Sequence, residues 1–263
     1  EIAQDEFIVA QPSGYINLSA EVTANSYILT QGGAYCIAAV KGNDSNEWLS
    51  KTSSADVLWE TFGTSTAPKI GDLIKSVSYK DGYVSFQTSD QFKEGNAVIA
   101  AKDASGNILW SWHIWMTDQP QEHVYKNNAG TMMDRNLGAY HNPNASTNGD
   151  DIYNGYGMYY QWGRKDPFNR PYDYAFKNNN DKSGYNAIGG TVRFKYVDAE
   201  KSEDAGTLEF AIANPMTFVR GSKDNAYDWL YVGHNDQLWD GKSKSVYDPC
   251  PRGWRVPDGD VFE

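Results

Sequence analysis

Short runs of alternating apolar and polar residues fill the first 117 residues of the chain, separated by turn-forming stretches at fairly even intervals. Alternation with a period of two predicts strands that bury one face, and many short strands in this rhythm are typical of a β-sandwich. We predict strands at residues 15–22, 26–30, 34–40, 57–62, 73–79, 83–88, 97–102 and 108–115. The sandwich then spans residues 14–117, and its strand spacing favours an immunoglobulin-like arrangement. Residues 1–13 contain Gln, Asp and Glu residues, Pro12 and Ser13, and are predicted to form a tether.

Two of the predicted hairpins carry strong turn signals. Asp81-Gly82 lies between two alternating runs and predicts a type I′ turn, because both central residues of that turn need a positive φ. Ser105-Gly106-Asn107 joins the last two strands in a similar way. These two turns therefore predict the pairing of four of the strands.

The last predicted strand is apolar on both faces. Alternation places its residues in two sets, Trp110, Trp112 and Ile114 on one face, and Leu109, Ser111, His113 and Trp115 on the other. Since neither face is cleanly polar, we expect the sandwich to cover one face and the rest of the chain to cover the other.

A change of composition marks a second domain. Residues 118–123 are polar, contain Pro120 and predict a linker, and residues 124–263 are rich in aromatic residues and glycine. Residues 131–138 and 191–198 predict strands, whereas the period at 207–214 leaves a helical turn and a strand equally open. Residues 141–151 and 178–184 are predicted to be exposed loops. The second domain is therefore predicted to be loop-rich and without a long helix.

Two segments are predicted to form the core of this domain. Residues 153–164 hold five aromatic residues and three glycines, and residues 249–257 hold three prolines and Gly253. Proline fixes φ and glycine frees it, so the second segment must turn sharply. Trp254 and Val256 share one side of it, and Arg252 and Gly253 are expected to stay outside.

Charge and composition exclude some partners. The net charge is −11 and the pI is about 4.8, which argues against nucleic acid and anionic membranes, since both need a basic face. No apolar run approaches the roughly 18 residues that span a bilayer. Aromatic residues make up 14% of the chain and either fill an irregular core or stand exposed as sugar-stacking platforms. We interpret Cys36 and Cys250 as two free thiols, because they lie in different predicted domains.

Three segments carry a resemblance to a known family. The runs are TMMDRNLGA (131–139), YYQWGRKDPF (159–168) and DPCPRGWRVP (248–257). They resemble the signature segments of the Fibrobacter succinogenes major paralogous domain family, whose members are surface proteins of Bacteroidetes, over residues 123–263. The GWRVP core is also similar to that of formylglycine-generating enzymes, which implies an α+β, C-type-lectin-like fold. Family members usually continue further past this core, so the resemblance implies that the second domain is incomplete at its carboxyl end.

No catalytic group stands out. The four histidines His113, His123, His141 and His234 lack metal-site spacing, and His113 is predicted to be a satisfied core or interface residue. The catalytic cysteines of formylglycine-generating enzymes have no counterpart here, so we predict a protein that is not an enzyme. No cofactor is predicted. Calcium is the one alternative, through the oxygen-rich loops 148–151, 178–181 and 235–240, but ordinary turns explain these residues better.

The site prediction has two parts. The candidate ligand-binding residues are Tyr156, Tyr159, Trp162, Arg164, Trp229 and Trp239. The residues predicted to pin loops together, as the family's structural signature, are Asp134, Arg135, Asn136, Trp254, Arg255 and Pro257. A partly buried Arg–Asp network is the expected role of the arginines in this second set, and Arg164 is open to that role as well.

The sequence therefore predicts a non-catalytic binding protein of the extracellular or outer-membrane cell surface. Its work would be adhesion or glycan recognition, with a glycan or a host surface protein as partner and a lipid anchor upstream. The alternative is a structural subunit of a fimbria, in which the sandwich exchanges strands with other pilus subunits. A formylglycine-generating-like enzyme is the second alternative.

Overall fold

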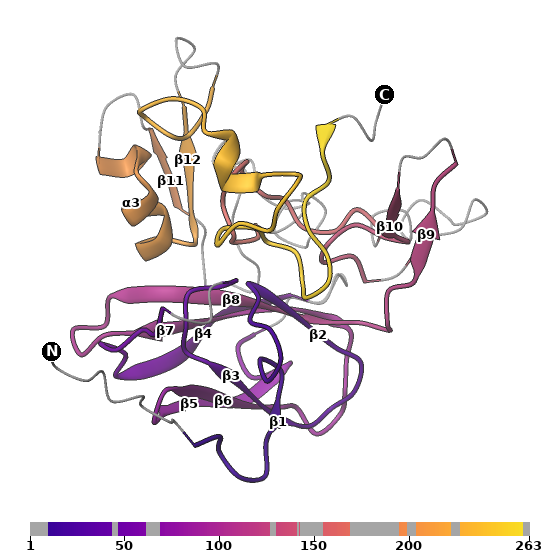
Figure 1. Ribbon diagram of the computed structural model, residues 1–263. Helices are drawn as coiled ribbons and strands as arrows, with labels where there is room; N and C mark the ends of the chain where they lie inside the picture. Colours follow the sequence, from indigo (N-terminus) through magenta and orange to yellow (C-terminus); the bar gives the residue numbers. More distant parts are fainter. Residues whose placement is uncertain are drawn as a thin grey trace, which may run out of the picture.

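The computed structural model describes residues 10–43, 47–61, 69–126, 130–140, 142, 155–168, 195–198, 204–221 and 227–259. The protein is mainly β, with several sheets and little helix, as the sequence predicts (Figure 1). Two large sheets form the lower body in the view of Figure 1, and a loop-rich region lies above them.

Each large sheet has four strands, and the two sheets stack face to face (Figure 1). The first has the order β1 (Ile16–Asn17), β3 (Ala34–Ala38), β6 (Tyr83–Thr88), β5 (Ile74–Lys80). The second has the order β2 (Ser26–Leu29), β8 (Ile108–Met116), β7 (Gly95–Lys102), β4 (Ser54–Thr61). The pairs β1–β3 and β2–β8 are parallel, and the other neighbours are antiparallel.

All eight strands predicted before residue 117 are present, and the first is much shorter than predicted. Residues 15–22 alternate well, yet β1 covers only Ile16–Asn17. The side chain of Asn17 accepts from the backbone N of Ser19 at 2.9 Å and from its hydroxyl at 2.7 Å. This local bond diverts the chain into a turn, since a short polar side chain competes with the strand ladder.

The sandwich core is built around the inner face of β8. Trp110, Trp112 and Ile114 are fully buried there. Trp112 lies opposite Ile99 of β7 in the ladder, and Trp110 lies opposite the small Ala101. A large residue facing a small one fills the space between the sheets without overpacking.

The turn between β5 and β6 has the predicted backbone geometry. Asp81 has φ 46° and Gly82 has φ 79°, so both central residues are left-handed as a type I′ turn requires. In the second hairpin Gly106 has φ 84°, and the Asp103 carboxylate accepts from the backbone N of Ser105 at 2.9 Å and of Asn107 at 2.8 Å. Both predicted hairpins are therefore confirmed.

The turn at Gly82 gives a stability prediction. Replacing Gly82 with Ala should lower the free energy of unfolding by about 1–2 kcal/mol, because a Cβ is strained at positive φ. Urea denaturation measures the change. Gly259→Ala is the control, since Gly259 lies outside the left-handed region and an added Cβ there meets open space. Equal loss in the two variants would contradict the turn geometry.

Beyond residue 121 the described elements are short. Strands β9 (Glu122–Val124) and β10 (Thr131–Met133) form an antiparallel hairpin, and β11 (Lys195–Asp198) and β12 (Thr217–Arg220) pair in parallel. Two 3-10 helices, η3 (Asp204–Gly206) and η4 (Asp236–Trp239), and the helix α3 (Leu208–Ala213) complete this part. We call the described residues after 123 the loop-rich region.

Several predicted elements of this region can be compared with the structure. Residues 207–214 form a helix, because the Thr207 hydroxyl caps α3 by accepting from the Phe210 backbone N at 3.1 Å. The strand predicted at 131–138 ends at Met133, and Gly138 turns the chain with φ 81°. Of the strand predicted at 191–198, β11 covers Lys195–Asp198, and the other four residues lie outside the described part. The loops predicted at 141–151 and 178–184 also lie outside it, except for residue 142.

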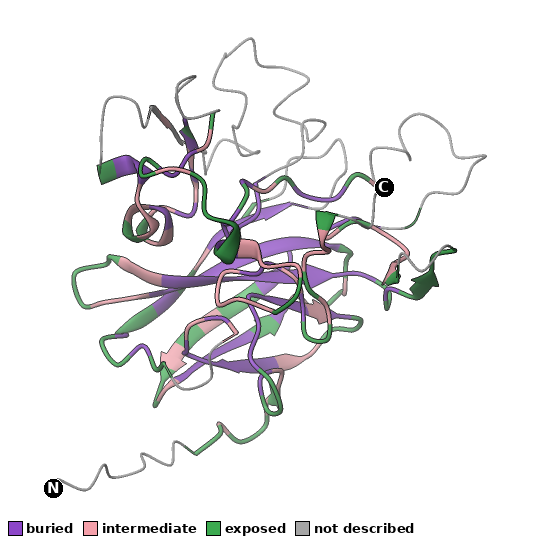
Figure 2. Ribbon diagram, turned by 45° about the horizontal axis from the view of Figure 1, so that its top comes forward, coloured by how far each residue is buried: buried purple, intermediate pink, exposed green. Residues whose placement is uncertain are grey.

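The loop-rich region covers the outer face of the sheet β2-β8-β7-β4 (Figure 1). Trp115 Nε1 donates to the Ala139 carbonyl at 2.8 Å, and Asn96 Nδ2 donates to the Gly138 carbonyl at 2.9 Å. Figure 2 shows β8 buried over most of its length and β9 exposed. The prediction that β8 is covered on both faces is therefore confirmed.

The middle of this contact is polar and buried. Lys165 Nζ lies 2.7 Å from Asp166 Oδ1 and 2.6 Å from the hydroxyl of Ser111 on β8, and that hydroxyl donates to Asp166 Oδ1 at 2.6 Å. Lys165 also lies 4.5 Å from the centre of the Trp110 ring. Burial lowers the pKa of Lys165, and the Asp166 carboxylate opposes that shift. A buried ion pair therefore joins the loop-rich region to the sandwich.

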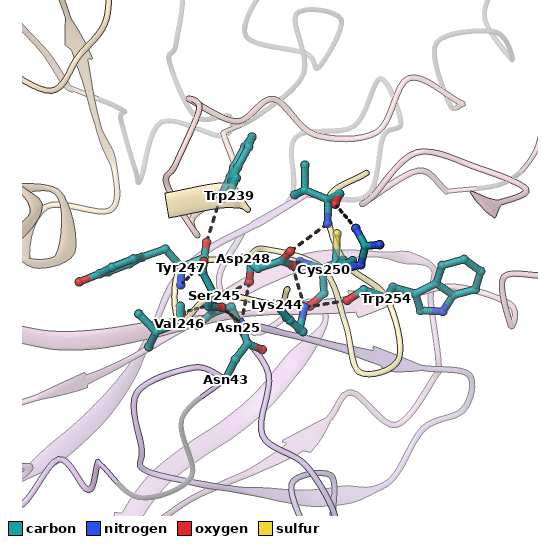
Figure 3. A network of polar contacts seen from close by, with 12 residues as sticks. Asn25, Asn43, Trp239, Lys244, Ser245, Val246, Tyr247, Asp248, Cys250 and Trp254 are labelled. Atoms are coloured by element: carbon teal, nitrogen blue, oxygen red, sulfur yellow. Dashed lines mark hydrogen bonds and ion pairs between the residues drawn. The ribbon is translucent and has the colours of Figure 1, made fainter. Parts of the chain in front are cut away.

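The segment rich in proline is also held against the sandwich (Figure 3). Asn25 Nδ2 donates to the carbonyls of Val246 at 2.8 Å and Asp248 at 2.9 Å. The buried Asp248 carboxylate accepts from Lys244 Nζ at 2.7 Å and from the backbone N of Val256 at 2.8 Å. The proline-rich segment is thus a tightly turned internal segment, as predicted, and it is anchored on the residue that precedes β2.

Side-chain exposure along the proline-rich segment follows the prediction. Arg252 and Gly253 are exposed, and Trp254 and Val256 are half-buried. Cys36 and Cys250 are both free, and Cys36 is buried. Burial raises the pKa of the Cys36 thiol to about 11, which fits a packing role rather than a reactive one.

Candidate functional site

One surface feature of the loop-rich region is a cluster of rings around Trp162. Trp162 is 42% exposed, and its ring centre lies 5.1 Å from that of Trp239 and 5.9 Å from that of His234. Trp239 is half-buried, and its Nε1 donates to the Tyr247 carbonyl at 3.1 Å. We call Trp162, His234 and Trp239 the Trp162 cluster. An exposed ring supported by two others can stack against an apolar face of a ligand.

Two carboxylates hold the imidazole of this cluster. Asp228 Oδ2 lies 2.6 Å from His234 Nδ1, and Asp236 Oδ1 lies 2.8 Å from His234 Nε2. These hydrogen bonds, led by that to Asp228, raise the pKa of His234. Asp236 itself is well exposed. The cluster therefore places a carboxylate that can accept hydrogen bonds beside an aromatic platform.

The segment carrying Trp162 has a rigid buried support. Trp229 Nε1 donates to the Trp162 carbonyl at 2.6 Å. Gly163 has φ 79° and packs so closely on Leu238 that a Cβ would come within 2.7 Å of its side chain. The position of the exposed ring is therefore set by contacts beneath it rather than by a free loop.

Two predicted ligand-binding residues are wrong for that role. Trp229 is buried and serves as the support just described. Arg164 is 2% exposed and donates to the carbonyls of Thr217 at 2.7 Å and Asn214 at 3.1 Å, and to Gln161 Oε1 at 2.8 Å. Burial lowers the pKa of Arg164 to about 10. Arg164 therefore ties α3 and β12 to the segment of Trp162 and is not a clamp for a ligand.

The remaining predicted ligand-binding residues are accessible. Tyr156 and Tyr159 are exposed, Trp162 is exposed, and Trp239 is half-buried. Tyr159 is held in place by an isolated β-bridge to Phe168. Its backbone N donates to the Phe168 carbonyl at 3.0 Å, and its carbonyl accepts from the Phe168 backbone N at 2.8 Å. Three of the six candidates, Tyr156, Tyr159 and Trp162, are thus exposed on one short segment.

The predicted structural signature is partly as expected. The Arg135 side chain is 4% exposed, donates to Asp134 at 2.9 Å and also pairs with Asp118, which fastens the linker to the start of the loop-rich region. Asn136 Nδ2 donates to the Tyr156 carbonyl at 3.3 Å. Trp254 and Pro257 are half-buried within the proline-rich segment.

Arg255 departs from that prediction. It is exposed, and its guanidinium donates to the carbonyl of its neighbour Val256 at 3.4 Å. The buried carboxylate nearby, Asp248, is taken by Lys244 instead. Lys244 Nζ also donates to the carbonyls of Cys250 and Trp254, each at 2.8 Å, so one lysine occupies the place expected for the arginine.

His113 is satisfied and buried, as predicted. Its Nε2 lies 2.7 Å from Asn96 Oδ1, and its Nδ1 lies 3.2 Å from the hydroxyl of Ser26 and 3.4 Å from that of Tyr160. Within the described ranges, no three His, Cys, Asp or Glu side chains are arranged to hold a metal ion. In the described oxygen-rich loop 235–240, Asp236 binds His234 and two other side chains bond nearby backbone N–H groups. Asn235 accepts from the backbone N of Gln237, and Asp240 accepts from that of Lys242.

The sequence missed three residues of this site, which are Asp228, His234 and Asp236. His234 was one of four scattered histidines, and no spacing linked it to Trp162. Trp229 and Trp162, 67 residues apart, are joined only by the fold. The one local signal is the density of Asp, Asn and aromatic residues between 227 and 240.

No protein-family model, curated protein or solved structure matches this chain. The family resemblance of the three segments therefore stays a prediction. In the part of the chain that the structure describes, no helix is long and apolar enough to cross a membrane.

Proposed function

We propose that this chain is a non-catalytic recognition protein of the cell surface that binds glycans through the Trp162 cluster. The observation that carries the proposal is the exposed Trp162 ring, fixed from below by Trp229 and flanked by the Asp236 carboxylate. Sugars present an apolar face of C–H groups and a rim of hydroxyls. A rigid ring beside a hydrogen-bond acceptor complements both.

The finer fold assignment is part of this proposal. It consists of an immunoglobulin-like sandwich at 14–117, a linker at 118–123 and a C-type-lectin-like domain at 124–263. The strand neighbours β3-β6-β5 and β4-β7-β8 support the first, because they match the sheet pairing of constant-type immunoglobulin domains. The short elements and long irregular segments beyond residue 123 support the second.

The cluster has a decisive test on a glycan array. Trp162→Ala should weaken binding to the glycans recognised by the wild-type protein by about tenfold or more, because a stacking ring is lost. Trp48→Ala is the matched control, since Trp48 is 41% exposed and lies on the sandwich. Binding that survives in Trp162→Ala, or a wild-type protein that binds no glycan, would overturn the proposal.

Strand exchange in a fimbria is the competing hypothesis. It would need an open sheet edge or an unfilled groove. The sheet edges β4 and β5 each carry a register shift, and Lys75 and Lys80 lie on β5. Bulges and lysines on edge strands oppose the addition of a further strand. These features support recognition over strand exchange.

A further inference from the structure

The exposed rings next to Trp162 follow a regular pattern. Tyr156, Tyr159 and Trp162 are 48%, 45% and 42% exposed. Of the residues between them, Gly157, Met158 and Gln161 are buried and Tyr160 is half-buried. Every third residue of this segment therefore presents a ring to solvent, and the others face the body of the protein. We call Tyr156, Tyr159 and Trp162 the ring row.

Each buried position in the segment is fastened separately. A Cβ on Gly157 would come within 2.5 Å of the Leu137 carbonyl, so the backbone at Gly157 packs directly against the backbone of Leu137. Met158 packs in a cluster with Trp59 and Phe168. Gln161 exchanges two hydrogen bonds with the backbone of Val219, at 2.7 and 3.0 Å. The three rings are thus preorganised, which reduces the entropy lost on binding.

The ring row offers three separate rings to a ligand. The Cα atoms of neighbouring rings are three residues apart, a span of at most about 11 Å in an extended chain. Trp162 has its own ring neighbours, His234 and Trp239. A single pyranose stacks on one ring, so a ligand that stacks on all three rings needs several units.

Charge narrows the class of ligand. The chain carries a net charge of −11, and the carboxylates of Asp228 and Asp236 bind the imidazole of the Trp162 cluster. A polyanionic glycan would be repelled, whereas neutral hydroxyls can donate to Asp236. Tyrosine hydroxyls beside the apolar faces of their rings suit the same neutral ligand.

Resting on the proposed glycan-binding function, we propose that the ring row forms successive subsites for a neutral, linear glycan. The ligand is then an internal stretch of a polysaccharide chain rather than a single terminal sugar. Each ring stacks on a different unit, and Asp236 accepts from a hydroxyl at the Trp162 end.

Calorimetric titration with neutral β-1,4-linked ladders of glucose, mannose, xylose and N-acetylglucosamine, from one to six units, tests this inference. Affinity for the recognised ladder should rise at least tenfold between one unit and the longest chain. Tyr156→Ala and Tyr159→Ala should each weaken binding of the longest chain by about three- to tenfold and leave binding of the single sugar unchanged. Tyr125→Ala, on a tyrosine that is also 45% exposed, is the matched control and should change neither.

The outcomes separate the two proposals. Affinity that is independent of length but lost in Trp162→Ala would overturn the ring row and leave the glycan-binding function standing. Unchanged binding in Tyr159→Ala would overturn it as well, as would tighter binding of polygalacturonate than of the neutral ladders. Absence of binding to every carbohydrate on the array and in the ladders would overturn both. Circular dichroism verifies that each variant is folded at the temperature of the titration.

Discussion

Asp166→Ala should lower the free energy of unfolding by about 3–5 kcal/mol, because it leaves the Lys165 ammonium buried without its carboxylate. The side chains of Lys165 and Asp166 are 2% and 5% exposed, so water cannot replace the lost partner. Ser111 on β8 would also lose the acceptor of its hydroxyl. Urea denaturation at neutral pH measures the change.

A second variant separates loss of the pair from loss of one partner. In Lys165→Met/Asp166→Asn both charges are removed, and the amide can still accept from Ser111. We expect this double variant to be more stable than Asp166→Ala, because replacing both members of a buried pair costs less than orphaning one. A double variant less stable than the single one would show that the pair itself stabilises the fold.

An exposed pair with the same separation is the control. Lys75 Nζ and Asp90 Oδ1 also lie 2.7 Å apart, but both side chains are more than half exposed. Lys75→Met should change the free energy of unfolding by less than about 0.5 kcal/mol. A comparable loss at both sites would mean that burial at the contact between sandwich and loop-rich region does not set the effect.

Local pattern was sufficient to predict the sandwich from sequence. The period of two predicted the strands, and Asp81-Gly82 predicted a turn that only left-handed residues can form. The two apolar faces of β8 even predicted a cover on its outer face, where Trp115 now bonds Ala139. These signals act within a few residues, so tertiary contacts had little opportunity to override them.

The candidate site was harder to predict because burial there depends on distant partners. Arg164 and Trp162 are neighbours in sequence and of types common at binding surfaces. Arg164 is buried because the carbonyls of Thr217, Ala211 and Asn214, about 50 residues away, gather around it. The His234 ring likewise lies beside that of Trp162 only because the fold brings distant segments together. No local period distinguishes an arginine that supports a site from one that forms it.

His113 makes the contact between β8 and the loop-rich region sensitive to acid. Asn96 Nδ2 donates to the Gly138 carbonyl at 2.9 Å, which leaves Asn96 Oδ1 to accept from His113 Nε2. Nδ1 then accepts from the hydroxyls of Ser26 and Tyr160. These three hydrogen bonds of the ring suit the neutral imidazole, and burial lowers the pKa of His113 to about 3.

A depressed pKa in the folded protein gives the direction of the pH effect. In the unfolded chain the imidazole gains its proton near pH 6.5, whereas in the folded protein it stays neutral down to about pH 3. The unfolded state therefore binds more protons throughout this window, and stability falls as the pH falls. From pH 7 to pH 5 the expected loss from this group is about 2 kcal/mol. His234 acts in the opposite direction, because its pKa is raised, and being largely exposed it offsets only part of the loss.

Urea denaturation of wild type and His113→Gln at pH 7 and pH 5 measures this effect. Glutamine can donate to Asn96 and accept from Ser26 but does not titrate, so the loss of stability between the two pH values should shrink by about 2 kcal/mol. His123→Gln is the matched control, since His123 lies on the exposed strand β9. A His113→Gln variant as acid-sensitive as the wild type would mean that the imidazole gains its proton in the folded protein. The buried contact between β8 and the loop-rich region would then tolerate a charge, contrary to the geometry around Asn96 and Tyr160.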